Sequence, residues 1–234
     1  REVLQFKKKV EAAVLNYHPL ANHDFTFSEV TEDYFENYTI NLAANTLRGY
    51  KSIYLRETGL KNYFGNIKVK AITTSFIQSY ITKLYNSGCS AKTISNSIGL
   101  VNVIMKHCTR LRYIPYNPVE GVTLPRKDKG KKIQPYTQEQ VQKLLHLSKG
   151  NHLAHTVIAL GTLAGLRRGE MAALTWDNVD LSDNPSITVT ASKYRVSPNL
   201  GIKNPQGIKE PKTTAGIRTI PIPDLLANIL RKQN

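Results

Sequence analysis

The chain has 234 residues, 41% of them hydrophobic, which allows one large or two ordinary domains with hydrophobic cores. No apolar run approaches the roughly 20 residues that a membrane-spanning helix needs, which argues against an integral membrane protein. The formal net charge of +15 is typical of a protein that binds a polyanion.

The N-terminal residues predict a connector. Residues 1–22 form a charged helical pattern that breaks at His18-Pro19, without a signal peptide or an initiator methionine. We therefore expect a piece of a longer protein. The two cysteines, Cys89 and Cys108, lack the spacing of metal ligands, so we expect reduced thiols in an intracellular, cytoplasmic protein.

Residues 23–121 predict a small bundle of four helices. A capping box at residues 26–29 opens the first helix, and the second is expected from about Ala44 to Phe64. Thr73 or Thr74 caps the third helix, and Ser90 opens the fourth. The apolar residues at helical spacing are Phe27, Val30, Tyr34, Phe35, Leu47, Tyr50, Ile53, Tyr54, Leu55, Phe76, Ile77, Tyr80, Ile81, Leu84, Ile94, Ile98, Val101, Met105 and Cys108.

The charge of this helical region has one sign. No Asp or Glu occurs between Glu57 and Glu120. The region instead contains Lys61, Lys68, Lys70, Lys83, Lys92, Lys106, Arg110 and Arg112. Such a surface repels itself unless an anion lies across it, and the candidates are nucleic acid and an anionic membrane. Because no strongly amphipathic basic helix stands alone here, nucleic acid is the favoured partner.

Residues 122–135 predict a basic linker. The tract contains Pro125 and Gly130 and a single acid, Asp128. Its basic residues are Arg126, Lys127, Lys129, Lys131 and Lys132. We expect these side chains to contact a phosphate backbone.

Residues 136–234 predict a second domain with helices and a small antiparallel sheet. A capping box at residues 137–140 starts it, an apolar helix covers Leu153–Leu163, and another helix begins near Asp224. After Asn184-Pro185 the apolar pattern alternates. The expected strand faces are Ile187, Val189 and Ala191, and Ile217, Ile220 and Ile222.

The segment 161–176 contains the strongest functional signal. It places Arg167 and Arg168 between two glycines, Gly165 and Gly169, at the end of an apolar helix. A guanidinium group fixed at such a junction suits two-pronged binding of phosphate oxygens. The alternative is an exposed basic turn between two core helices.

These residues resemble the first arginine box of the tyrosine recombinases, the phage integrase family, which reads Gly-Leu-Arg-x-Gly/Ser-Glu-Leu. Residues 208–222 resemble the family's lysine hairpin, with the pattern Lys-Thr-x-x-Gly-x-Arg-x-Ile-Pro starting at Lys212. Residues 46–50, with Phe64-Gly65 and residues 71–73, resemble the family's helical core-binding domain. The resemblance spans about residues 23–234.

The resemblance implies a mainly α fold: a helical core-binding domain followed by an α+β catalytic domain, on opposite faces of a DNA duplex. It implies a site-specific recombinase that cuts and rejoins DNA through a 3′-phosphotyrosyl intermediate during integration or excision of a mobile element. By the resemblance Arg167 stabilises charge on the phosphate, Glu170 supports it, and Lys212 protonates the leaving 5′ oxygen. Arg218 matches a hairpin residue that packs or contacts backbone, and is not expected to be catalytic.

The implied partner is double-stranded DNA, with self-association on the DNA and accessory DNA-bending or excisionase proteins, and without a metal or nucleotide cofactor. The expected location is the cytoplasm, in association with the nucleoid, for a protein encoded by a bacterium or a phage. Besides Arg168 and the basic linker residues, the residues expected to contact DNA are Thr46, Arg48, Tyr50, Lys51, Lys92, Thr93 and Ser95.

The sequence departs from the family pattern at its C-terminal end. In the family a His-x-x-Arg box and the nucleophilic tyrosine follow the lysine hairpin, whereas this chain ends at Asn234. Residues 107–110 spell His-x-x-Arg but precede Arg167, and we interpret them as a basic helix turn. Tyr136 and Tyr194 also precede Lys212. We therefore expect half an active site, able to bind DNA without forming a covalent adduct.

Three alternatives remain. A DNA-binding protein of the same fold could lack catalysis by design. An RNA-binding protein is disfavoured because aromatic RNA-binding signatures are missing. Type IB topoisomerases share the chemistry, but the small helical first domain favours a recombinase.

Overall fold

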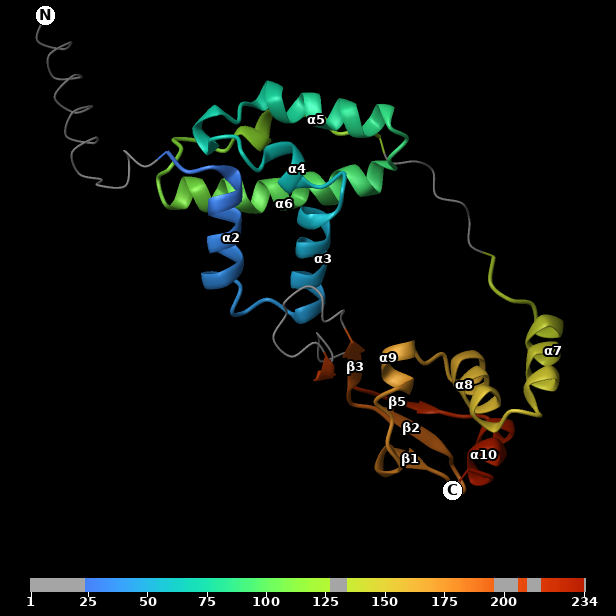
Figure 1. The fold of residues 1–234 in the computed structure, drawn as a ribbon. Coiled ribbons are helices and arrows are strands. Elements are labelled where there is room, and N and C mark those ends of the chain that lie inside the picture. Colours follow the sequence, from blue (N-terminus) through green and yellow to red (C-terminus); the bar gives the residue numbers. More distant parts are fainter. Residues whose placement is uncertain (1–23, 127–133, 196–205, 210–215, 234) are drawn as a thin grey trace, which may run out of the picture. The chain divides into compact units, whose positions relative to one another are not determined.

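The computed structural model describes residues 24–126, 134–195, 206–209 and 216–233. The chain divides into two compact units, Arg1–Gly130 and Lys131–Asn234, drawn in Figure 1. The division falls inside the tract expected to be a linker. The described residues are mainly helical with small antiparallel sheets, which confirms the expected fold class. The expected connector, residues 1–22, lies outside the described residues.

The first unit contains five α-helices and two 3-10 turns within its described residues. They are α2 (Phe27–Asn37), α3 (Ala44–Leu55), α4 (Leu60–Phe64), η2 (Val69–Ala71), α5 (Thr74–Asn86), α6 (Ala91–Arg110) and η3 (Pro118–Gly121). α6 is the longest helix and packs against α2, α3 and α5, so it forms the centre of the bundle.

Side-chain caps begin three of these helices, as the sequence predicts. The hydroxyl of Thr26 accepts the Glu29 N–H at 3.3 Å, and the Glu29 carboxylate accepts the Thr26 N–H at 2.7 Å. Thr73 and Ser90 each accept the backbone N–H three residues later, both at 3.2 Å. Thr73 rather than Thr74 is therefore the cap of α5. Gly88, in the left-handed conformation at φ 79°, follows the end of this helix.

The single helix expected over residues 44–64 is wrong, because the chain breaks into α3 and α4. Arg56 is extended (φ −59°, ψ 157°), and the Gly59 N–H donates to its carbonyl at 2.7 Å. A Cβ on Gly59 would lie 2.6 Å from that carbonyl oxygen, so the turn needs glycine. Tyr54 and Leu60 would point about 120° apart on a continuous helix. The break lets both enter one core, where they are 2% and 0% exposed.

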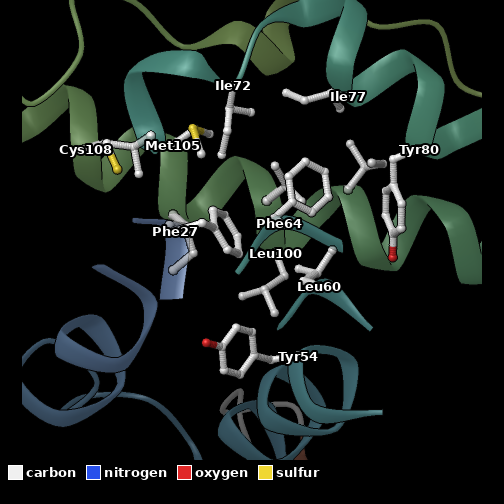
Figure 2. Close-up of a cluster of buried hydrophobic side chains, with 14 of the residues drawn as sticks. Phe27, Tyr54, Leu60, Phe64, Ile72, Ile77, Tyr80, Leu100, Met105 and Cys108 are labelled. Atoms are coloured by element: carbon white, nitrogen blue, oxygen red, sulfur yellow. The ribbon is translucent and has the colours of Figure 1, made fainter. Parts of the chain in front are cut away.

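The core of the first unit is rich in aromatic side chains (Figure 2). The ring centroid of Phe64 lies 5.3 Å from that of Phe27 and 5.0 Å from that of Tyr80. The buried apolar residues that α6 supplies are Ala91, Ile94, Ile98, Leu100, Val101, Ile104, Met105 and Cys108. The helical spacing of the sequence thus identified the buried face of α6 correctly.

The second unit combines four α-helices and two small sheets within its described residues. The elements are α7 (Gln138–Ser148), α8 (His152–Leu163), α9 (Arg168–Met171), η4 (Trp176–Asn178), β1 (Val179–Asp180), β2 (Ser186–Val189), β3 (Ser192–Arg195), β4 (Gln206–Lys209), β5 (Arg218–Pro221) and α10 (Asp224–Arg231). The predicted capping box of α7 is present: Gln140 N–H donates to Thr137 Oγ1 at 3.3 Å, and Thr137 N–H donates to Gln140 Oε1 at 2.9 Å.

The strands form a three-stranded antiparallel sheet in the order β1-β2-β5 and a separate pair, β3-β4. β2 matches its prediction, with Ile187 and Val189 buried. The prediction for β5 is partly wrong: Ile217 precedes the strand and is 52% exposed. Pairing of β5 begins at Arg218 opposite Val189, so a period of two puts Arg218 and Ile220 on its inner face. Ala191, expected on the face of β2, lies beyond the end of that strand.

The expected hairpin over residues 208–222 also differs from the structure. β4 pairs with β3, whereas β5 pairs with β2. The two strands on either side of residues 210–215 therefore belong to different sheets and do not form one hairpin. Lys212 itself lies outside the described residues.

A second core holds this unit together. It contains Ala159 and Leu160 from α8, Ile187 from β2, and Leu226 and Ala227 from α10. α8 contacts α7, α9 and α10. It therefore supports the turn between α8 and α9. No helix in the described ranges is both long and apolar enough to cross a membrane.

Candidate active site and nucleic-acid interface

The predicted arginine box forms a tight turn between α8 and α9, which we call the Arg167 turn (residues 164–171). Gly165 is left-handed at φ 64°, a conformation that glycine adopts without strain. Leu166 is 5% exposed, and its N–H donates to the Leu160 carbonyl at 3.3 Å. These two features turn the chain out of α8 and make Arg167 the N-cap of α9. The Arg167 side chain is 80% exposed.

The Glu170 carboxylate, 9% exposed, binds two arginines at once. Its Oε2 accepts the backbone N–H of Arg167 and Nη2 of Arg218, both at 2.9 Å. Its Oε1 accepts Nη1 of Arg167 at 3.0 Å and Nη1 of Arg218 at 3.2 Å. The structure therefore brings together Arg167 and Glu170, as expected, and adds Arg218 from a strand 48 residues away from Glu170.

This arrangement controls the charge of the cluster. The hydrogen bonds from Arg218, assisted by those from Arg167, lower the pKa of Glu170 to about 2 against the opposing effect of burial. Glu170 in turn raises the pKa of Arg218. Glu170 is therefore an anion at neutral pH, and the two arginines and one carboxylate together carry one net positive charge.

Gly169 allows the Arg167 turn to lie directly against β3. A Cβ at this position would lie 2.4 Å from Ser192 Oγ and 2.9 Å from the Lys193 carbonyl oxygen, so a side chain here would push the two segments apart. The glycine thus fixes the turn from a second side.

Arg168, expected to contact DNA, has an exposed side chain on the first turn of α9. It lines an apolar cavity of about 640 Å³ together with Met171 and Trp176. Among the described residues no group of three or more His, Cys, Asp or Glu could hold a metal ion.

The expected DNA-binding residues of the first unit lie on α3 and at the start of α6, two helices that contact each other. Arg48 and Lys92 are exposed. Tyr50 instead packs against the core, and Lys51 Nζ lies 6.0 Å from the centre of the Phe35 ring. The remaining three, which are partly buried, are Thr46, Thr93 and Ser95.

The beginning of the expected linker is attached to the first unit. The Gln78 side chain of α5 accepts the Thr123 N–H at 2.9 Å and donates to the Thr123 carbonyl at 3.2 Å. Arg126 follows as an exposed side chain. The other expected linker contacts, Lys127, Lys129, Lys131 and Lys132, lie outside the described residues.

His107, in the out-of-order His-x-x-Arg sequence, has a structural role. It is 3% exposed between Tyr34 and Tyr38, with ring centroids 5.1 and 4.3 Å away. Its Nδ1 lies 2.9 Å from Arg110 Nη2. Burial, together with the nearby Arg110, lowers its pKa, so it is a neutral core histidine.

Arg218 is the site residue whose role the sequence did not predict. The residue pattern contained one usable signal: Arg218 shares the alternation of Ile220 and Ile222, where an apolar side chain belongs. The partner, Glu170, could not be found this way because it lies in a different element.

The chain is similar to known proteins in both sequence and structure. Residues 26–85 match the phage integrase N-terminal SAM-like domain. The chain is 29% identical over 185 residues to a "Tyrosine recombinase XerC-like" protein of Caldanaerobacter subterraneus subsp. tengcongensis, covering 74% of this chain and 47% of that protein. It is 26% identical to the "Prophage ps2 probable integrase" of Lactococcus lactis, covering 95% and 57%. The chain thus spans about half the length of these curated relatives.

Solved structures share the fold. The Tn1549 transposon integrase in complex with transposon right end DNA superposes with a TM-score of 0.71 at 21% identity, over 89% of this chain and 64% of that one. A lambda integrase dimer bound to a COC′ core site gives 0.63 at 14% identity, over 93% and 57%. Together with the arginine box and the helical first unit, the sequence matches support the tyrosine recombinase (phage integrase) family for this chain, and the solved structures show the same fold.

Proposed function

We propose that this chain is the DNA-binding and phosphate-binding part of a site-specific DNA recombinase that integrates or excises a mobile element. The observation that carries the proposal is the cluster of Arg167, Glu170 and Arg218: an exposed guanidinium, fixed at a rigid turn, in a cluster whose total charge is +1. Relatives named as integrases and tyrosine recombinases, and integrases solved with DNA, support it.

In this proposal the first unit binds the duplex through its basic surface. It has net positive charge without any Asp or Glu between residues 57 and 120, and Arg48 and Lys92 are exposed there. Neutralised phosphates release condensed counterions, so affinity falls steeply with salt. Lysine, with its flexible stem, and arginine, with its planar fork, can both neutralise phosphates of the DNA backbone.

The second unit binds the scissile phosphate. Arg167 donates to the phosphate oxygens and stabilises the charge that builds up in the pentacoordinate transition state. Lys212 donates a proton to the departing 5′ oxygen, while a tyrosine of the full-length protein forms a 3′-phosphotyrosyl bond. The energy of the phosphodiester is kept in that bond, so rejoining needs no nucleotide. We expect the recombining protein to assemble as a dimer or tetramer on DNA, with DNA-bending or excisionase partners.

The two proposed roles of Arg167 and Lys212 predict different failures in the full-length protein. Arg167→Lys should slow both cleavage and rejoining by about 10²–10³, because an ammonium cannot replace the guanidinium fork. Lys212→Ala should be slow on ordinary DNA only. A 5′-bridging phosphorothiolate has a better leaving group that needs no proton, so it should restore cleavage by Lys212→Ala.

The assay is covalent trapping of the protein on a suicide substrate carrying the cleavage site. Arg167→Ala is the control, because sulfur substitution should not rescue it. Equal rescue of both variants, or of neither, would remove Lys212 from the acid role. A full-length protein that binds DNA but never forms the covalent adduct would instead support a non-catalytic DNA-binding protein.

A further inference from the structure

Arg218 occupies a position on the inner face of a sheet, where an apolar side chain is usual. It lies on the inner face of β5 with Ile220, directly opposite Val189 of β2, which is 4% exposed. Only 30% of the Arg218 side chain is exposed. A charged side chain on such a face is rarely retained unless it is paired.

The pairing of Arg218 with Glu170 uses both ends of its guanidinium. Nη1 and Nη2 donate to Oε1 and Oε2, and Nη1 also lies 3.4 Å from the Gly216 carbonyl oxygen. Arg167 touches Glu170 through Nη1 and its backbone N–H. In the described part of the chain, Nε and Nη2 of Arg167 have no hydrogen-bond partner. Arg218 therefore donates both of its terminal nitrogens to the carboxylate, whereas the Arg167 side chain donates only Nη1.

The charges explain why two arginines are needed. A lone carboxylate would neutralise Arg167 and compete with a phosphate for its donors. With Arg218 attached, Glu170 still orients Arg167, but the cluster keeps one positive charge. β5 is hydrogen-bonded along its length to β2, so Arg218 holds Glu170 from a rigid strand.

We propose that Arg218 is a positioning residue for the recombination reaction: it neutralises and fixes Glu170, so that Arg167 presents Nε and Nη2 of its guanidinium to the scissile phosphate. The inference rests on the proposed function for its kinetic part. It predicts that Arg218 acts through Arg167 and does not itself contact DNA.

The kinetic test compares single and double variants of the full-length protein. Arg218→Met should slow covalent cleavage about 10- to 100-fold, and Arg167→Met about 10²–10³-fold. The double variant should be no slower than Arg167→Met alone, since a positioning residue has nothing left to position. Arg218→Lys should recover part of the loss, because it restores the charge without the fork. Arg231→Met removes a positive charge from α10 and should leave cleavage unchanged.

Two results would overturn the proposal. If the fold-losses in cleavage rate of the two single variants multiply in the double variant, Arg218 acts independently of Arg167, as a general structural residue. A fall of about 0.9 in the slope of log affinity against log salt for Arg218→Met would make it a direct phosphate contact. The expected result is an unchanged slope. Trp176 fluorescence checks that each variant has a folded second unit.

A measurement without catalysis separates this inference from the proposed function. Inorganic phosphate is titrated while the backbone amide signal of Arg167 is followed by nuclear magnetic resonance. Arg218→Met should bind phosphate about fivefold or more weakly than the parent protein, and Arg231→Met should bind equally well. Equal binding by Arg218→Met contradicts the inference. Weaker binding by Arg218→Met in a protein that never cleaves DNA would support the charge argument and reject the proposed function.

Discussion

Replacing Glu170 with glutamine removes the one negative charge of the arginine cluster at nearly constant shape. The carboxylate pKa is about 2 in the folded chain against an ordinary value of 4.5. At about 1.4 kcal/mol per pKa unit, this difference corresponds to roughly 3 kcal/mol of folding stability at neutral pH. Glu170→Gln should therefore destabilise the second unit by roughly 3 kcal/mol. The amide also turns an N–H group toward an arginine, which acts in the same direction.

The pH dependence has a definite sign. Because the folded pKa lies below the unfolded one, the contribution is complete above pH 4.5 and is lost as the pH falls toward 2. The difference between the parent chain and Glu170→Gln should shrink to about half at roughly pH 3.2, midway between the two pKa values. It should be constant between pH 6 and 8.

Urea unfolding followed by tryptophan fluorescence measures this difference. Trp176 is the one tryptophan of the chain and lies in the second unit beside α9, so its signal reports that unit. With a denaturant slope of about 1.5 kcal/mol per molar urea, the midpoint should fall by about 2 M. Asp183→Asn, an exposed carboxylate of the same unit, should barely move it. A midpoint within about 0.3 M of the parent chain, or a difference independent of pH, would refute the reasoning.

Two further predictions concern the first unit. Arg48→Ala and Lys92→Ala should each reduce the slope of log DNA affinity against log salt by about 0.9, as measured by fluorescence anisotropy. Lys61→Ala should leave the slope unchanged, because Lys61 is already paired with Glu32 at 2.9 Å. Equal slopes for all three variants would show that the DNA binds elsewhere. Burial raises the pKa of the Cys108 thiol to about 12. An aromatic disulfide reagent at pH 8 should therefore modify Cys89 in the folded chain and reach Cys108 only after unfolding. Rapid modification of Cys108 in the folded protein would contradict its place in the core.

Much of this fold was readable from local sequence. Thr26, Thr73, Ser90 and Thr137 cap helices because a side-chain oxygen and an N–H two or three residues away are enough to satisfy a helix end. The buried face of α6 follows from spacing alone. The arginine box also identified Arg167 and Glu170, since both belong to one short turn.

The errors came from interactions between distant segments. The break between α3 and α4 appears where Tyr54 and Leu60 must reach the same core, a demand that helical spacing within residues 44–64 does not contain. Likewise, β4 and β5 look like neighbours in sequence, yet each pairs with another strand. Strand pairing depends on which faces are buried, and this is decided by the whole unit.

Local sequence patterns predict the helical units, their caps, the basic first unit and the exposed arginine next to an acidic residue. The contact between Arg218 and Glu170 arises only when the second unit folds. Glu170 and Arg218 are 48 residues apart and belong to a helix and a strand, so no local pattern connects them. Their pairing follows from the folding of the second unit, and the low exposure of Glu170 makes a charged partner necessary.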